Sequence, residues 1–195
     1  IKGNTRVGHS GTMITEACEY TNSFLSFAPT VGIILNVAAD HLDFFKDLDD
    51  IRHSFRRYAE LLPANGALII NGDIDNLEYF TKDLDCKVIT VGSEESGSMY
   101  TAKNITFDEF AHGSYDLYVE GEFKHRVTLK VTGMHNIYNS LAAIATAHFL
   151  NIDKEDILNG LEAYGGTDRR FQFKGKLGDI TIIDDYAHHP DEITA

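Results

Sequence analysis

Two clusters near the start of the chain contain residue types that bind divalent cations. Residues 16–19 hold two glutamates, and residues 40–43 include Asp40 and His41 directly after an apolar run. A carboxylate and an imidazole offer hard oxygen and borderline nitrogen ligands to a metal ion. The structural alternative is that Asp40 caps the following turn and that His41 is a hydrogen-bonded surface histidine.

A third cluster, residues 133–139, combines an imidazole with two amides. His135, Asn136 and Asn139 lie at the expected start of a helix. An amide both donates and accepts hydrogen bonds, so this cluster suits the edge of a base or another neutral polar ligand. On spacing alone, capping of the helix by Asn136 is the better interpretation.

Two further clusters lie near the end of the sequence. Arg169 and Arg170 are adjacent, and guanidinium groups bind phosphate or carboxylate bidentately, although surface pairing with acidic side chains is equally compatible with the pattern. Residues 184–192 hold four acids together with His188 and His189. Such a concentration of acids and histidines is compatible with a metal site, an acid–base group or a binding site for ribose and carboxylate.

Several common catalytic motifs are absent from the sequence. Residues 8–11 contain two glycines but lack the lysine of a phosphate-binding loop. There is no Gly-x-Ser-x-Gly elbow and no Cys-x-x-Cys pair. A serine hydrolase and a zinc ribbon are therefore excluded.

The composition limits the class of protein. The chain has 195 residues and a net charge of −13, which makes nucleic acid an unfavourable partner. It has no apolar run long enough to span a membrane, and its two cysteines are too few for a disulfide framework. We expect a single cytoplasmic domain over residues 1–195, with no nucleic-acid or membrane partner.

The elements that must position these clusters alternate between strands and helices. Residues 31–37 form a continuous β-branched run, and a helical stripe from Leu48 is stopped by Pro63. Strands over 67–70 and 86–91, with a short helix over 75–82, complete the first part. Because helices separate these strands, we predict an α/β fold, a mostly parallel sheet flanked by helices.

The second part of the chain changes character. Short alternating segments predict a small antiparallel β excursion on the same domain. Two helices and two closing strands follow. The predicted elements are strands over 115–119 and 126–131, helices over 137–150 and 154–164, and strands over 171–173 and 179–183.

Taken in order, the clusters resemble the central, ATP-binding domain of the Mur ligases. The resemblance covers nearly the whole chain and rests on five motifs in register. It implies an ATP-dependent amide ligase of peptidoglycan synthesis that joins L-alanine to UDP-N-acetylmuramate through an acyl phosphate. The matching segments are residues 16–25, 36–43, 133–139, 169–171 and 184–190.

The resemblance also implies roles for individual residues. Glu16 would bind the Mg²⁺ carried by the ATP phosphates, and His41 would bind a second Mg²⁺ between the terminal phosphate and the substrate carboxylate. The catalytic set would be His41, Arg169 and His188. The ATP-binding side chains would be His135, Asn136, Asn139, Arg169 and Asp185. The muramoyl and alanine side would be lined by Arg170, Tyr186 and His188.

The resemblance further implies a three-domain bacterial enzyme. The family's phosphate loop would precede Glu16 and another domain would follow residue 190, so we expect the chain alone to be inactive. Two alternatives come from the residues themselves. One is a metal-dependent hydrolase that uses His41, Asp43, Asp184, His188 and His189, and the other is a nucleotide-binding module without catalysis.

Overall fold

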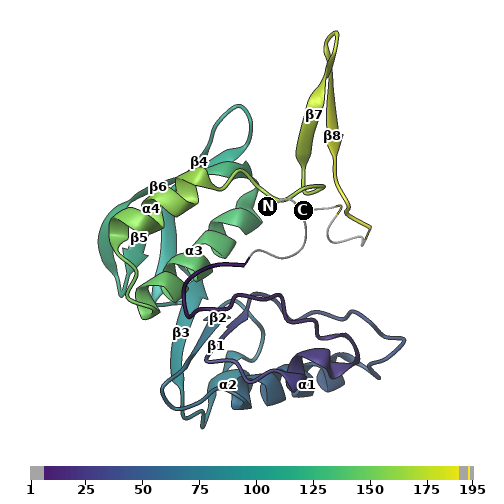
Figure 1. Ribbon diagram of the computed structural model, residues 1–195, viewed down its shortest axis with the longest axis vertical. Helices are drawn as coiled ribbons and strands as arrows, with labels where there is room; N and C mark the ends of the chain where they lie inside the picture. Colours follow the sequence, from purple (N-terminus) through teal and green to yellow (C-terminus); the bar gives the residue numbers. More distant parts are fainter. Residues whose placement is uncertain (1–6, 189–192, 194–195) are drawn as a thin grey trace.

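The computed structural model describes residues 7–188 and 193, and its central feature is a six-stranded sheet (Figure 1). The strands follow one another across the sheet in chain order. The first four run parallel, and β4, β5 and β6 pair antiparallel, which confirms the predicted α/β class with its antiparallel excursion. The strands are β1 (Val31–Ile34), β2 (Ala67–Asn71), β3 (Lys87–Gly92), β4 (Tyr100–Phe107), β5 (His112–Val119) and β6 (Glu122–Thr132).

Helices cover both faces of this sheet. A short 3-10 helix precedes β1, two helices lie between the first three strands, and two follow β6 (Figure 1). The longest, α3, has 16 residues, and no helix among the described residues is long and apolar enough to cross a membrane. The helices are η1 (Tyr20–Ser26), α1 (Leu48–Glu60), α2 (Leu77–Thr81), α3 (Met134–Phe149) and α4 (Lys154–Ala163).

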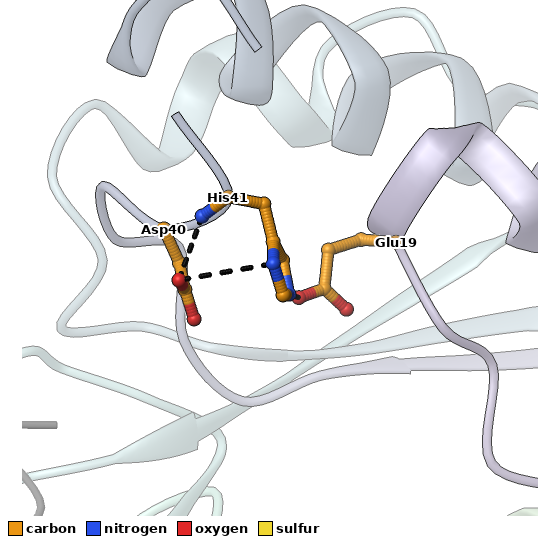
Figure 2. A group of neighbouring side chains, drawn as sticks. All are labelled: Glu19, Asp40 and His41. Atoms are coloured by element: carbon orange, nitrogen blue, oxygen red, sulfur yellow. Dashed lines mark hydrogen bonds and ion pairs between the residues drawn. The ribbon is translucent and has the colours of Figure 1, made fainter. Parts of the chain in front are cut away.

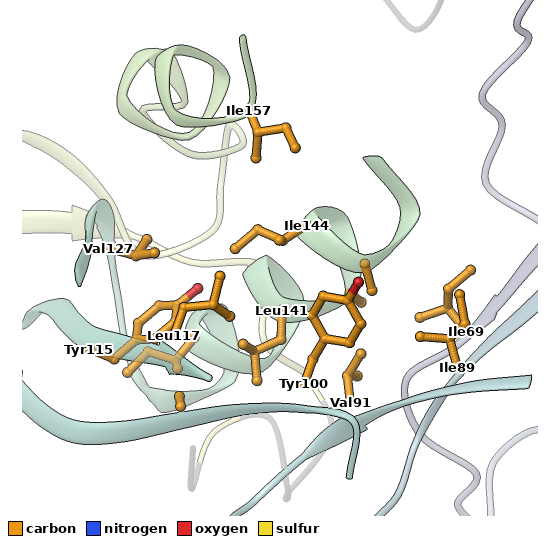
Figure 3. Close-up of a cluster of buried hydrophobic side chains, with 14 of the residues drawn as sticks. Ile69, Ile89, Val91, Tyr100, Tyr115, Leu117, Val127, Leu141, Ile144 and Ile157 are labelled. Carbon is orange, nitrogen blue, oxygen red and sulfur yellow. The ribbon is translucent and has the colours of Figure 1, made fainter. Parts of the chain in front are cut away.

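Strand β2 shows why helices must cover both faces of the sheet. Ala67 and Ile69 pack into a core with α3, and Leu68 and Ile70 pack into a second core with α1 and α2. All four side chains are 0% exposed. Successive side chains of a strand point to opposite faces, so four consecutive apolar residues must be buried on both faces of the sheet. Figure 3 shows the larger core, in which strand side chains meet Leu141 and Ile144 of α3.

Local sequence sets the ends of the helices. The Asp47 side chain accepts a hydrogen bond from the Asp50 N–H and so caps the start of α1. Helix α3 starts after Gly133, whose φ of +89° is accessible to glycine. A Cβ at Gly133 would lie 2.7 Å from the His135 ring, so the absence of a side chain here leaves space for the imidazole.

The arrangement of strands β7 (Gln172–Leu177) and β8 (Ile180–Asp184) differs from the prediction that the last two strands close the sheet. They do not close the main sheet but form a separate antiparallel hairpin that projects from the body of the molecule (Figure 1). Only the short turn at Gly178 and Asp179 separates them, so each strand finds its partner in the other. Strand β1 is also shorter than predicted, because its pairing with β2 stops at Ile34.

Candidate functional site

The candidate metal group lies in two loops on either side of β1. Glu19 stands immediately before η1, and His41 lies in the loop between β1 and α1. In parallel sheets, ligands bind outside the carboxyl ends of the strands, and the His41 loop leaves β1 at that end. The chain between Glu19 and β1 folds back, so that the two residues meet.

Glu19, Asp40 and His41 are the one group of three such side chains among the described residues whose ligand atoms all lie within 4.8 Å of one another. His41 Nε2 is 3.3 Å from Glu19 Oε1, and His41 Nδ1 is 3.9 Å from Asp40 Oδ1. Figure 2 shows the imidazole between the two carboxylates. We refer to these three residues as the metal group.

The backbone of this loop is fixed by the same residues. His41 has a φ of +52°, which is uncommon for a residue other than glycine. The Asp40 carboxylate accepts a hydrogen bond from the His41 N–H at 2.6 Å, so Asp40 also has the turn-capping role that was its structural alternative. The His41 carbonyl accepts hydrogen bonds from the N–H groups of Phe44 and Phe45, both at 2.9 Å.

The donor set of the metal group suits a magnesium ion. Mg²⁺ prefers carboxylate oxygens and keeps several waters, and an octahedral shell with bonds of about 2.0–2.1 Å separates neighbouring ligand atoms by about 3 Å. The distances of 3.3 and 3.9 Å involve different nitrogens of the His41 ring, and one ion binds only one of them; with one ligand atom from each residue, the three atoms lie within 4.8 Å of one another. All three side chains are partly exposed, which leaves room for water and phosphate oxygens. Side-chain rotation would bring the three ligand atoms from within 4.8 Å to the closer spacing that a shared ion requires.

The family resemblance assigned Glu16 and His41 to two different Mg²⁺ ions and gave Glu19 no role. In the structure Glu16 is exposed and lies outside the metal group. The sequence did contain the relevant signal, because both glutamates belong to the cluster at residues 16–19. Glu19 lies beside His41 because of its position immediately before η1. The spacing of residues in the sequence does not reveal that position.

The three predicted adenine-side residues lie together at the start of α3. The Asn136 amide donates to the Thr132 carbonyl at 2.8 Å and lies 3.2 Å from His135 Nε2. The Asn139 amide donates to Asn136 Oδ1 at 3.3 Å. Asn136 gives no side-chain cap, because the N-cap residue is Gly133. The side chains of His135 and Asn139 remain exposed.

The remaining predicted residues gather at the base of the β7–β8 hairpin. Asp185 accepts hydrogen bonds from the N–H groups of Phe171 and Ala187 at 2.6 and 2.7 Å. The Arg169 guanidinium lies over the Tyr186 ring, 4.5 Å from its centre. His188 Nδ1 is 3.0 Å from the Tyr186 carbonyl oxygen.

Arg170 belongs to this region as well, and its N–H donates to the Thr167 carbonyl at 3.2 Å. His189 falls outside the described residues. Among the described residues, the other members of the hydrolase set do not form a metal cluster, because the only such cluster is the metal group. Asp184 instead lies 3.5 Å from the Lys174 ammonium group within the hairpin.

A small polar cavity of about 210 Å³ lies close to the carboxyl ends of β1 and β2. Its lining includes Asn36, which follows β1, and Asn71, the last residue of β2. Arg52 of α1 contributes a positive charge to the same cavity. Sequence reasoning missed Arg52, whose position on a helix gives no indication that it faces the ends of the strands.

Comparison with known proteins identifies relatives of the whole chain. Residues 6–147 match the family model of the Mur ligase middle domain. A UDP-N-acetylmuramate–L-alanine ligase of Lachnospira eligens is 59% identical over 195 residues. The match takes in all of this chain but only 42% of that relative, so the chain spans about two fifths of the relative's length.

Solved structures agree with this relationship. The UDP-N-acetylmuramate–alanine ligase MurC of Thermotoga maritima matches with a TM-score of 0.74 and 28% identity, over 88% of this chain and 38% of that one. MurF of Acinetobacter baumannii matches with a TM-score of 0.75 and 26% identity, over 90% of this chain and 37% of that one.

Proposed function

Because the chain belongs to the Mur ligase family, as its middle domain, we propose that it forms the ATP- and magnesium-binding part of a ligase that joins L-alanine to UDP-N-acetylmuramate. The observation that carries this proposal is the metal group at the carboxyl end of β1, in a chain of this family. The proposed substrates, ATP and a nucleotide sugar, fit the bacterial cytoplasm that the sequence predicts.

The proposed reaction gathers negative charge at each stage. ATP would phosphorylate the muramoyl carboxylate, the alanine amine would attack the acyl phosphate, and the tetrahedral intermediate would collapse to the amide and phosphate. A bound Mg²⁺ supplies positive charge that offsets the charge on the phosphate oxygens. Such preorganised charge acts most strongly where charge develops in the transition state.

Different residues of the chain would bind the metal and position its ligands. Glu19 and His41, with Asp40, would hold one Mg²⁺, because Glu19 lies 3.3 Å from His41. The assignment of Glu16 to a separate Mg²⁺ stays a prediction. Asp40 would also keep the His41 backbone in place. The metal group carries a net negative charge, so it would attract Mg²⁺. The other proposed ligands of the protein are anions.

The nucleotide would be bound by residues from the start of α3 and from the hairpin base. His135, Asn136 and Asn139 offer both donors and acceptors, as the edge of adenine requires. Asp185 would accept from the ribose, and Arg169 would bind phosphate oxygens bidentately. Arg170, Tyr186 and His188 would contact the muramoyl and alanine substrates.

A chimaera tests this proposal. In the chimaera, this chain replaces the matching segment of the Lachnospira eligens relative, to which it is 59% identical. We expect ADP release that requires both UDP-N-acetylmuramate and L-alanine, whereas this chain alone should release none. ADP release that is independent of L-alanine, or ligation by the chain alone, would contradict the proposal.

Metal analysis separates the proposal from the hydrolase alternative. A magnesium site that keeps its waters binds weakly and exchanges on dialysis. We therefore expect no retained transition metal after purification without added metal. A stoichiometric transition metal, together with hydrolytic activity of the chain alone, would favour the hydrolase.

A further inference from the structure

The side chain of Tyr20 connects the two loops that carry the metal group. Its hydroxyl donates a hydrogen bond to Asp43 Oδ2 at 2.7 Å. Its ring centre lies 4.7 Å from the centre of the His41 ring, with 35° between the two planes. Tyr20 directly follows Glu19, and Asp43 lies two residues after His41, so a single side chain contacts both sides of the Glu19–His41 pair.

The loops themselves supply little rigidity. The Glu19 and His41 side chains are 32% and 35% exposed, and ion pairs with this exposure contribute little to stability. A backbone φ of +55° at Thr21 is unfavourable for a β-branched residue, whereas the φ of +60° at Asn22 lies in a region that asparagine adopts more readily. The buried Asn22 Oδ1 also has no hydrogen-bond partner among the residues that the structure describes. Other contacts must therefore hold this conformation.

Aromatic packing anchors Tyr20 on the side of the His41 loop. The ring meets Phe44 edge to face, with ring centres 6.0 Å apart, and Phe44 in turn packs against Phe45. Phe45 is 2% exposed and ties the loop to the protein interior.

From these contacts we infer that Tyr20 is a positioning residue, which fixes His41 relative to Glu19 through its bond to Asp43 and so prepares the metal group for a divalent cation. The inference rests on the proposed function, in which this group binds Mg²⁺. Metal ligands held by supporting hydrogen bonds bind more tightly, because less order is lost on binding. Tyr20 itself need not touch the metal or the substrates.

The test uses Mn²⁺ as the probe, because carboxylate sites that suit Mg²⁺ also accept Mn²⁺. Its dissociation constant from this chain is measured by water-proton relaxation. Tyr20→Phe removes only the hydroxyl, and we expect it to raise the dissociation constant about five-fold. Tyr79→Phe is the matched control, since Tyr79 is 40% exposed on α2, comparable with 38% for Tyr20. The control should leave the constant unchanged.

Changes at Asp43 show whether the hydrogen bond carries the effect. Asp43→Ala should weaken Mn²⁺ binding as much as Tyr20→Phe, and the double variant no more than either single one. Asp43→Asn keeps an oxygen that accepts from the Tyr20 hydroxyl, so binding should stay within about two-fold of the unchanged chain. Independent, additive effects of the two substitutions would overturn the inference.

A spectroscopic measurement distinguishes positioning from general loss of structure. The ¹⁵N signals of the His41 ring should broaden or shift in Tyr20→Phe while those of His135 stay in place. Unchanged Mn²⁺ affinity and unchanged His41 signals would overturn the role of Tyr20 and leave the proposed function intact. If Mn²⁺ fails to bind the unchanged chain, or binds equally well to Glu19→Gln, the proposed metal site itself is wrong.

Discussion

The His41 imidazole lies 3.3 Å from the Glu19 carboxylate, although β1 separates the two residues in the chain. Glu19 precedes the strand and His41 follows it, so the folding of the segment between Glu19 and β1 brings the two residues together. Folding of the sheet therefore assembles the metal group from two loops.

The first prediction concerns which glutamate binds metal. Glu19→Gln removes a charged ligand from the metal group, and we expect the dissociation constant for Mn²⁺ to rise about ten-fold or more. Glu16→Gln is the matched control, because Glu16 is exposed and lies outside the group. Titration calorimetry measures both. A larger loss for Glu16→Gln would show that Glu16, and not Glu19, holds the ion measured in this titration.

The second prediction concerns the amides at the start of α3. Asn139→Ala removes an exposed amide whose bond to Asn136 Oδ1 is long, at 3.3 Å. We expect about a five-fold loss of ATP affinity in the chimaera and little change in thermal stability. Asn159→Ala, at an exposed position of α4, is the control. Equal ATP affinities of the two variants would argue against an adenine site here.

The third prediction concerns pH. Burial lowers the pKa values of His125 and His148, with Lys154 beside the former and Lys124 beside the latter. Both ring nitrogens of His125 are buried with no hydrogen-bond partner in the described part of the chain, and the Tyr100 hydroxyl is 3.0 Å from His148 Nδ1. A buried neutral histidine binds its proton more readily in the unfolded chain.

Stability should therefore fall as the pH drops below the ordinary histidine pKa of about 6.5. Thermal unfolding between about pH 7.5 and 5.5 measures this, and His125→Leu should reduce the slope. The exposed His53 gives the control His53→Gln, which should not change it. A slope that is the same in all three proteins would refute the link to His125.

The fourth prediction concerns the larger core. Tyr115 is 0% exposed, and its hydroxyl lies 2.6 Å from the Ser140 hydroxyl of α3. Tyr115→Phe should lower the free energy of unfolding by about 1 kcal/mol, because a buried hydrogen bond is lost. Chemical denaturation measures the change, with Tyr79→Phe as the exposed control. No difference between the two variants would show that this bond adds nothing.

The sequence predicted the sheet well where pattern and burial coincide. The apolar run in β2 and the alternation in β5 and β6 each follow from which faces are buried, so the fold class and most elements were correct. The hairpin of β7 and β8 was placed wrongly, because apolar composition marks a strand but does not specify its partner. Loop geometry determines that Glu19, and not Glu16, lies beside His41, and it also determines the contacts of Tyr20. The spacing of residues in the sequence does not encode this geometry.

The most direct test of the account is the magnesium dependence of ADP release by the chimaera and its His41→Ala variant. With UDP-N-acetylmuramate and L-alanine present, we predict that His41→Ala requires at least about ten-fold more Mg²⁺ for half-maximal release and has a lower kcat. Unchanged ADP release by His41→Ala at limiting Mg²⁺ would contradict the assignment of the metal group and the function built on it.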